Sequence, residues 1–188
     1  MTGARSGLGD DGDENAYLPQ PVDGRYHLSD SVVTDFELFW SLRQTASEVD
    51  DSDLADHLLD QALQLVRGEP FLGAGRGYAW TSSIGTTIIV AVVDVAEQVG
   101  LSRLTCDDPR GAERAARAGL TISPGEERLY RVLLRAAAAQ DSKPMVERLY
   151  REMLDVLADP DLGIEPEATV SDETVDLFNE LIGRRRTA

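Results

Sequence analysis

An internal repeat in the second half of the chain limits the possible folds more than any other feature. Its members recur at an offset of 33 residues: Asp108, Ala112, Ala116 and Leu120 return as Asp141, Met145, Leu149 and Met153. A repeat of about 34 residues built from two antiparallel helices is the tetratricopeptide pattern. We therefore predict an all-α, tetratricopeptide-like antiparallel stack of about seven helices, most regular between residues 107 and 158.

Helix start signals occur along the whole chain and support this prediction. Most combine a Ser, Thr or Asp cap with a later Glu or with proline in the first turn. The expected starts are Thr34 with Glu37, Asp51 or Ser52, Asp108 with Pro109, Ser123 with Glu126, Ser142 with Pro144, and Ser171. The longest helix is expected over about residues 78–104, where two glycines make a bend possible.

Three Glu residues precede an Arg by four positions on the predicted helices, which is the favourable order for an ion pair within a helix. The pairs are Glu113 with Arg117, Glu127 with Arg131, and Glu147 with Arg151. We interpret them as parts of a solvated outer face.

The N-terminal segment differs from the rest of the chain. Gly, Asp, Asn and Pro favour loop over residues 1–23, and Asp23-Gly24 is a hairpin turn signal. The stretches "AYLP" (16–19) and "RYHL" (25–28) lie on either side of this turn. We predict a short N-terminal β-hairpin there.

The charge of the chain disfavours contact with nucleic acid. The formal net charge is −16, and residues 1–60 alone hold 14 acidic and 3 basic side chains. Proteins bind nucleic acid largely by neutralising phosphates with Lys and Arg. The one dense basic run, Arg184–Arg186, is interpreted as a solvated tail. No direct nucleic-acid contact by this chain is expected.

Neither a membrane span nor a secretory signal is predicted from the sequence. The longest apolar run, "IIVAVVDVA" (88–96), is about half the length of a membrane helix and contains Asp94. The N-terminus lacks a basic segment followed by an apolar one. A lone cysteine, Cys106, excludes an internal disulfide framework and fits a reducing compartment. A cytoplasmic location is therefore expected.

No residues with recognisable catalytic or ligand-binding spacing emerge. The candidates considered were His27, His57, Cys106, the acidic run 10–14, the glycine-rich segment 73–77, Trp40 and Trp80. The histidines lack metal-ligand spacing, the acidic run lacks a calcium-loop frame, and the glycines lack a following Lys-Ser/Thr. The tryptophans are expected in the core. We predict no enzyme activity, no catalytic or metal-binding residues and no cofactor, and the protein-interaction residues stay unassigned.

From about Val33 to Leu181 the chain resembles the bacterial transcriptional activator domain, the tetratricopeptide-like module of actinobacterial antibiotic-regulatory proteins. The matching stretches, in order, are "TDFELF" (34–39), "ALQLVRGEPFLG" (62–73), "DDPRGAERAARAGLTISPGEERLYRVLLRAAAAQ" (107–140), "ERLYREMLDVLAD" (147–159) and "LGIEPEATV" (162–170). A composition rich in Arg and Ala, with Lys143 as its single lysine, also suits an actinobacterial source.

The resemblance implies a division of the chain. Residues 1–30 look like the loop and wing hairpin at the end of a winged-helix domain, residues 31–183 like the helical domain, and residues 184–188 like a basic tail. A non-enzymatic regulatory module that acts through protein contacts is the implied function. Its partners would be other domains of the parent chain or a second copy. The alternative is a general helical-repeat scaffold for peptide binding or oligomerisation, for example in a LysM-containing protein, with no transcriptional role.

Overall fold

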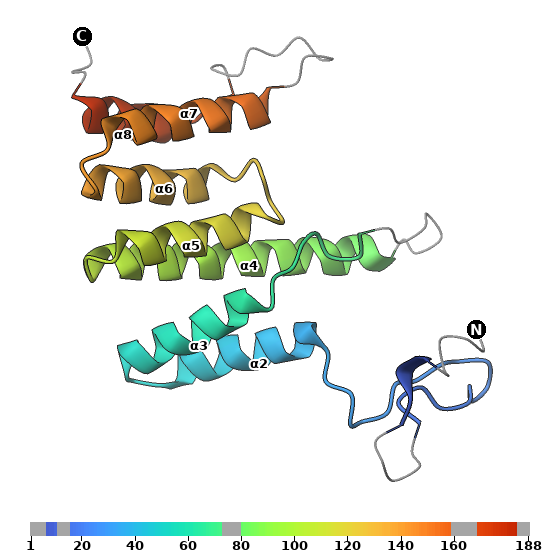
Figure 1. Ribbon diagram of the computed structural model, residues 1–188. Helices are drawn as coiled ribbons and strands as arrows, with labels where there is room; N and C mark the ends of the chain where they lie inside the picture. The colour runs from blue at the N-terminus through green and yellow to red at the C-terminus, as the bar shows by residue number, and fades with distance from the viewer. Residues whose placement is uncertain (1–6, 11–15, 73–79, 159–168, 184–188) are drawn as a thin grey trace. The chain divides into compact units, whose positions relative to one another are not determined.

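The computed structural model describes residues 7–10, 16–72, 80–158 and 169–183, without the side chains of residues 80 and 81. Seven helices are named within these ranges, and no β-strand is found there, so the predicted all-α fold is confirmed (Figure 1). The helices are α2 (Asp35–Glu48), α3 (Ser52–Gln64), α4 (Trp80–Thr105), α5 (Pro109–Leu120), α6 (Glu127–Ala139), α7 (Lys143–Leu157) and α8 (Asp172–Ile182).

By packing, the chain divides into two compact units, Met1–Trp40 and Ser41–Ala188. The division falls inside α2. The domain boundary predicted at residue 30 stays a prediction, and the basic tail at 184–188 lies outside the described residues.

The N-terminal unit contains the tight turn that Asp23-Gly24 predicts. Both residues have a positive φ, 51° and 75°, and the Val22 and Arg25 backbones exchange two hydrogen bonds of 3.0 and 2.9 Å. The β structure in the described part of this unit is limited to isolated β-bridges, one of them between Val22 and Arg25. The predicted two-stranded hairpin is therefore not confirmed. One pair of residues beyond a turn is too short a ladder to form strands.

Two of the predicted helix caps, at the starts of α2 and α3, form as expected. The Glu37 backbone N–H donates to Thr34 Oγ1 at 3.1 Å, and the Thr34 N–H donates to a Glu37 carboxylate oxygen at 2.9 Å. This is a complete capping box at the start of α2. The Asp51 carboxylate accepts from the backbone N–H groups of Asp53 and Leu54 at 3.0 and 3.1 Å, so Asp51 is the cap of α3.

The capping box predicted at Ser123 is wrong. Residues Ser123–Glu126 form a turn closed by a hydrogen bond of 3.2 Å from the Glu126 N–H to the Ser123 carbonyl, and α6 begins only at Glu127. Proline at the second position of a β-turn is favoured, and Gly125 is a poor residue for a first helical turn. The Pro-Gly pair that suggested a helix start therefore forms a turn, and the helix begins after it.

The corners before α5 and α7 share one local structure. Asp107 and Asp141 follow the ends of α4 and α6 with φ of 55° and 52°. At each corner the backbone makes the paired hydrogen bonds of a Schellman motif, in which the residue after the aspartate donates 2.8 and 3.1 Å bonds back to Arg103 and Ala137. The structural equivalent of Asp141 is therefore Asp107, not Asp108. The repeat length measured between these corners is one residue longer than the 33-residue offset seen in the sequence.

Within the second unit, α6 is the central helix, and it packs against α4, α5, α7 and α8. More than half of its residues are buried: Leu129, Tyr130, Val132, Leu133, Leu134, Ala136 and Ala137. On the far side, α8 is joined to α7 by the stacked rings of Tyr150 and Phe178, whose centroids lie 3.9 Å apart. The helices α4, α5 and α6 follow one another in adjacent positions (Figure 1).

The long helix α4 is a core helix of this unit. Its segment Ser82–Thr105 is long and apolar enough to cross a membrane by length and composition, although the apolar run over residues 88–96 is too short for a membrane span. Its middle and C-terminal parts, however, pack against α3, α5 and α6. The buried residues are Ala91, Val92, Val93, Val95, Ala96 and Val99. Burial in a protein core accounts for these residues, whereas Ile84, Val90 and Leu101 of the same helix are exposed.

Glycines allow α4, α5 and α6 to approach closely. A Cβ atom at Gly119 of α5 would lie 2.5 Å from Leu129 Cδ1 and 2.9 Å from Ala96 Cβ. One at Gly100 of α4 would lie 2.7 Å from Val132 Cγ1. All three separations are too short for real carbon contacts. Gly100, one of the two glycines that made a bend possible, therefore serves packing, and α4 runs without interruption from Trp80 to Thr105.

We expect Gly119→Ala to lower the free energy of unfolding by about 1–3 kcal/mol, because the added methyl group overpacks the α4–α5–α6 contact. Chemical denaturation monitored by circular dichroism measures this change. The matched control is Gly85→Ala in α4, where an added Cβ would meet Phe71 at an ordinary 3.9 Å. This control should raise stability by up to about 1 kcal/mol through helix propensity. A neutral Gly119→Ala would contradict the close packing.

Candidate protein-interaction surface

The helix α5 has one buried face of small residues and one exposed face of arginines. Asp108 starts the helix by accepting a 2.8 Å hydrogen bond from the Gly111 N–H, and Pro109 occupies the first turn. The face packed against neighbouring helices consists of Gly111, Ala112, Ala115, Ala116, Gly119 and Leu120. Arg110, Arg114 and Arg117 follow one another at helical spacing on the other side.

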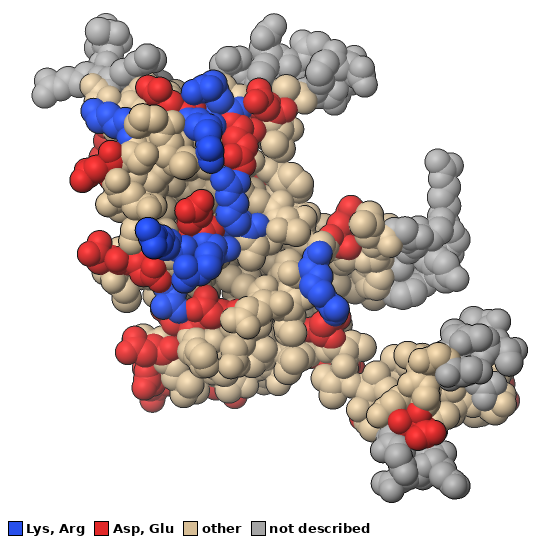
Figure 2. All heavy atoms as spheres, viewed as in Figure 1, with Lys and Arg blue, Asp and Glu red and all other residues tan. Residues whose placement is uncertain are grey.

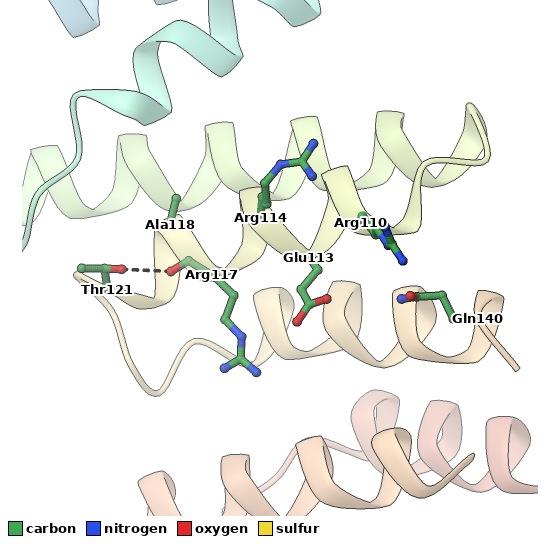
Figure 3. Close-up of a pocket in the computed structure, with 7 residues that line it drawn as sticks. All are labelled: Arg110, Glu113, Arg114, Arg117, Ala118, Thr121 and Gln140. Carbon is green, nitrogen blue, oxygen red and sulfur yellow. Dashed lines mark hydrogen bonds between the residues drawn. The ribbon is translucent and has the colours of Figure 1, made fainter. Parts of the chain in front are cut away.

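These arginines line an open recess of about 570 Å³ between α5 and the C-terminal end of α6. Its lining residues are Arg110, Glu113, Arg114, Arg117, Ala118, Thr121 and Gln140. Figure 3 shows Arg110, Glu113 and Arg117 extending from α5 on the side of α6, whereas Arg114 points the other way. In the sequence, the signal for this surface is the stretch "RGAERAAR", in which arginines recur at i, i+4 and i+7. The interaction residues were nevertheless left unassigned from the sequence.

Arg117 is held in place by a residue of α7. Its guanidinium forms an ion pair with the Glu152 carboxylate through two hydrogen bonds, the longer of which is 3.4 Å. This interaction raises the pKa of Arg117. The buried Tyr130 of α6 lies near the pair, and burial raises the pKa of its hydroxyl. Arg117 is therefore a fixed donor at one end of the recess.

The other two arginines are much freer. The Arg114 side chain is 73% exposed, and its nearest acidic group is Asp108 at 3.9 Å. Arg110 is exposed, and it has no ion pair or hydrogen bond with any residue that the structure describes. Two guanidinium groups thus remain available to a binding partner.

Basic and acidic side chains alternate on the surface of the stack. Figure 2 shows Lys and Arg side chains gathered over α5 and the helices that follow it, with Asp and Glu beside them. The chain as a whole carries a net charge of −16. A positive recess on so acidic a chain is a local feature that the total charge does not reveal.

A second polar cluster joins α8 to α6. The Glu127 carboxylate accepts hydrogen bonds of 2.6 Å from the Ser171 hydroxyl and 2.7 Å from the buried Thr174 hydroxyl. Arg131 donates to Thr174 Oγ1 at 3.1 Å and pairs with Glu173 at 3.3 Å. Burial would raise the pKa of Glu127, but the hydrogen bonds from Ser171 and Thr174 outweigh it, and the pKa is lowered.

Two of the three predicted Glu–Arg pairs thus have a different role from the one predicted. Arg117 bonds to Glu152 of α7, and the Arg131 side chain, only 11% exposed, bonds to α8. Both therefore connect separate helices, and the prediction that they belong to a solvated outer face is wrong. Since each partner lies on a different helix, far away in the sequence, spacing within one helix could not reveal it.

Other charged side chains also link neighbouring helices. Arg128 of α6 contacts Asp94 and Glu97 of α4 at 3.2 and 3.1 Å, and Glu126 at 3.1 Å. Arg103 of α4 pairs with a carboxylate of α3. These charges act as connections within the stack, unlike Arg110 and Arg114.

The residues considered earlier for chemistry form no shared site in the described ranges. His57 Nε2 lies 3.2 Å from the Gln61 side-chain nitrogen on the surface of α3, and Cys106 is exposed at the end of α4. Among the described residues, no group of three or more His, Cys, Asp or Glu could hold a metal ion. Most of the acidic run and the glycine-rich segment lie outside those residues. The absence of metal, cofactor and catalytic residues stays a prediction.

The two tryptophans were expected in the core. Trp40 is half-buried and meets Phe36 and Phe39 edge to face, with ring centroids 6.1 and 6.0 Å apart. The Trp80 side chain lies outside the described residues.

A family model of the bacterial transcriptional activator domain matches residues 33–175, which is more than half of the chain. The chain belongs to the bacterial transcriptional activator domain family. Neither a curated protein nor a solved structure matches it. The match confirms the resemblance seen in the sequence, and it identifies the chain as a helical module related to transcription activators.

The activator domain match spans α2 to the first turn of α8. It therefore includes both the arginine recess and the Glu127 cluster. This family is regulatory and is not a family of enzymes.

We expect Glu127→Gln to lower the free energy of unfolding at neutral pH by about 1–3 kcal/mol, because the amide weakens the hydrogen bonds to α8. Since the pKa of Glu127 is lowered from 4.5, its contribution is present above that pH and is lost as pH falls through the lower, folded value. Denaturant titrations at neutral pH and below pH 4.5 measure both effects.

In the same titrations Glu127→Gln should lose less stability on acidification than the unaltered chain. Glu147→Gln, at an exposed position of α7, is the matched control and should be nearly neutral. An identical loss in the Glu127→Gln variant and the unaltered chain would show that the Glu127 carboxylate does not support α8.

Proposed function

We propose that this chain is a non-enzymatic regulatory module of a transcription regulator and that it acts through contacts with other proteins or other domains. The observation that carries the proposal is the open arginine recess of α5. It lies inside the matched activator domain, on a stack whose helices are otherwise connected by ion pairs and hydrogen bonds. A rigid stack with unpaired charge on its surface suits recognition of a partner.

The proposal includes a cytoplasmic setting, since a transcription regulator works where the chromosome is. It also keeps the division of the chain suggested by the resemblance. Residues 1–30 would be the wing end of a winged-helix domain, and residues 184–188 a solvated basic tail. Contact with DNA would then come from other parts of a regulator, and this chain would transmit a signal.

A reporter assay tests the proposal. The 188-residue chain is fused to an unrelated DNA-binding domain, and transcription is measured in an actinobacterial host from a promoter that carries the matching operator. We expect several-fold more transcript than with the DNA-binding domain alone. Transcript at the level of the DNA-binding domain alone, from a fusion that circular dichroism shows to be folded, would contradict a transcriptional role and leave a general scaffold.

We also expect no binding of the isolated chain to duplex DNA at physiological salt. The net charge of −16 repels phosphates, and the recess offers few of the several phosphate contacts that non-specific binding requires. Electrophoretic mobility shift with a mixed-sequence duplex measures this. A salt-sensitive shift at sub-micromolar protein would refute the expectation.

A further inference from the structure

We propose that the arginine recess of α5 binds an acidic, extended segment of a partner protein, with Arg110 and Arg114 as the main contacts and Arg117 as a fixed end point. This assignment rests on the proposed function, because it gives a chemical identity to the partner. No family description or comparison assigns a ligand to this recess.

The first argument is that Arg110 and Arg114 take no part in the ion pairs that connect the described helices, a property that Arg148 of α7 shares outside the recess. Arg103, Arg117, Arg128 and Arg131 each bond to a carboxylate of another helix. Arg110 bonds to none in the described part of the chain, although acidic side chains outnumber basic ones almost two to one.

The second argument is that α5 gathers like charges at unfavourable spacing. Arg110 and Arg114 are four residues apart, and Arg114 and Arg117 are three apart, spacings at which like charges destabilise a helix. Glu113, which also lines the recess, offsets part of this repulsion, and an acidic ligand would relieve the rest.

The third argument concerns the geometry of a ligand. Arg110 and Arg117 are seven residues apart, which is about 10 Å along a helix. A peptide in the extended polyproline II conformation makes one turn in three residues and rises about 9 Å, so side chains three positions apart lie on the same face. An acidic side chain at every third position would therefore match the arginines, and a recess of about 570 Å³ can accommodate a short segment.

Arg117 can take part although it is already paired. A guanidinium has five N–H donors, and Glu152 accepts from only two of its nitrogens. Because Glu152 holds this side chain in place, little conformational freedom is lost when a second carboxylate binds. Gln140, at the opposite side of the recess, offers an amide that can donate to the peptide backbone (Figure 3).

The acidic character of the whole chain does not prevent this binding. At physiological ionic strength, charges farther away than about 8 Å are largely screened. A short segment in the recess would meet the arginines at contact distance and most carboxylates at a greater distance. A duplex, which is wide and evenly charged, could not avoid the acidic surroundings in the same way.

Fluorescence anisotropy with labelled synthetic peptides tests the proposal. One short peptide carries aspartate at every third position with alanine and glycine between, and its control carries asparagine in the same places. We expect the full chain to bind the acidic peptide with an affinity that falls as salt rises, and to bind the asparagine peptide at least about tenfold more weakly.

Variants of exposed arginines locate the binding site. The double variant Arg110→Gln with Arg114→Gln should weaken binding of the acidic peptide at least about tenfold. Its melting temperature should stay within a few degrees, because neither side chain is packed in the core. Arg148→Gln, at an exposed position of α7 outside the recess, is the matched control and should bind like the unaltered chain.

Equal binding of the two peptides would overturn the proposal, as would a double variant that binds like the unaltered chain. Competition of a labelled DNA duplex with the peptide for the recess would also overturn it, in favour of phosphate recognition. The reporter assay separates the two proposals. If the chain activates transcription but does not bind the acidic peptide, only the proposed role of the recess is refuted. If it binds the peptide but does not activate transcription, only the transcriptional role is refuted.

Discussion

The structure depends on the close contact of α4, α5 and α6, which only glycine and alanine allow. Gly119 and Gly100 leave no room for a Cβ atom against Leu129 and Val132. Because α6 also packs against α7 and α8, the position of every later helix follows from this contact. The two corners with Asp107 and Asp141 then repeat the same change of direction along the chain. Because protein interiors are close-packed, a methyl group added at either glycine would have to displace its neighbours.

Once the helices are placed, their surface charges come within reach of one another. Arg128 connects α6 to α4, Arg117 connects α5 to α7, and Glu127 connects α6 to α8. Partly exposed pairs of this kind stabilise a protein only modestly, but a network of them keeps neighbouring helices in register. On the exposed face of α5, Arg110 and Arg114 keep their charge available to a partner.

Much of the fold was predictable because it is local. The caps at Thr34 and Asp51 and the helical faces come from residues near one another in the sequence, and the family resemblance comes from the order of such stretches along the chain. The errors have physical reasons. Pro-Gly before α6 fits a turn as well as a helix start, and the adjacent aspartates Asp107 and Asp108 allow two repeat offsets that differ by a single position. The recess could not be derived as a site, because whether an arginine is paired depends on helices distant in the sequence.

The central claim is that the arginine face of α5 is the surface that meets a partner. Amide chemical shifts in two-dimensional NMR spectra of the ¹⁵N-labelled chain, recorded during titration with the acidic peptide, test it most directly. The account predicts that the shifting amides belong to Arg110, Glu113, Arg114, Arg117, Thr121 and Gln140 and to their neighbours in space. Unchanged α5 amides, with shifts on another face of the stack, would contradict it.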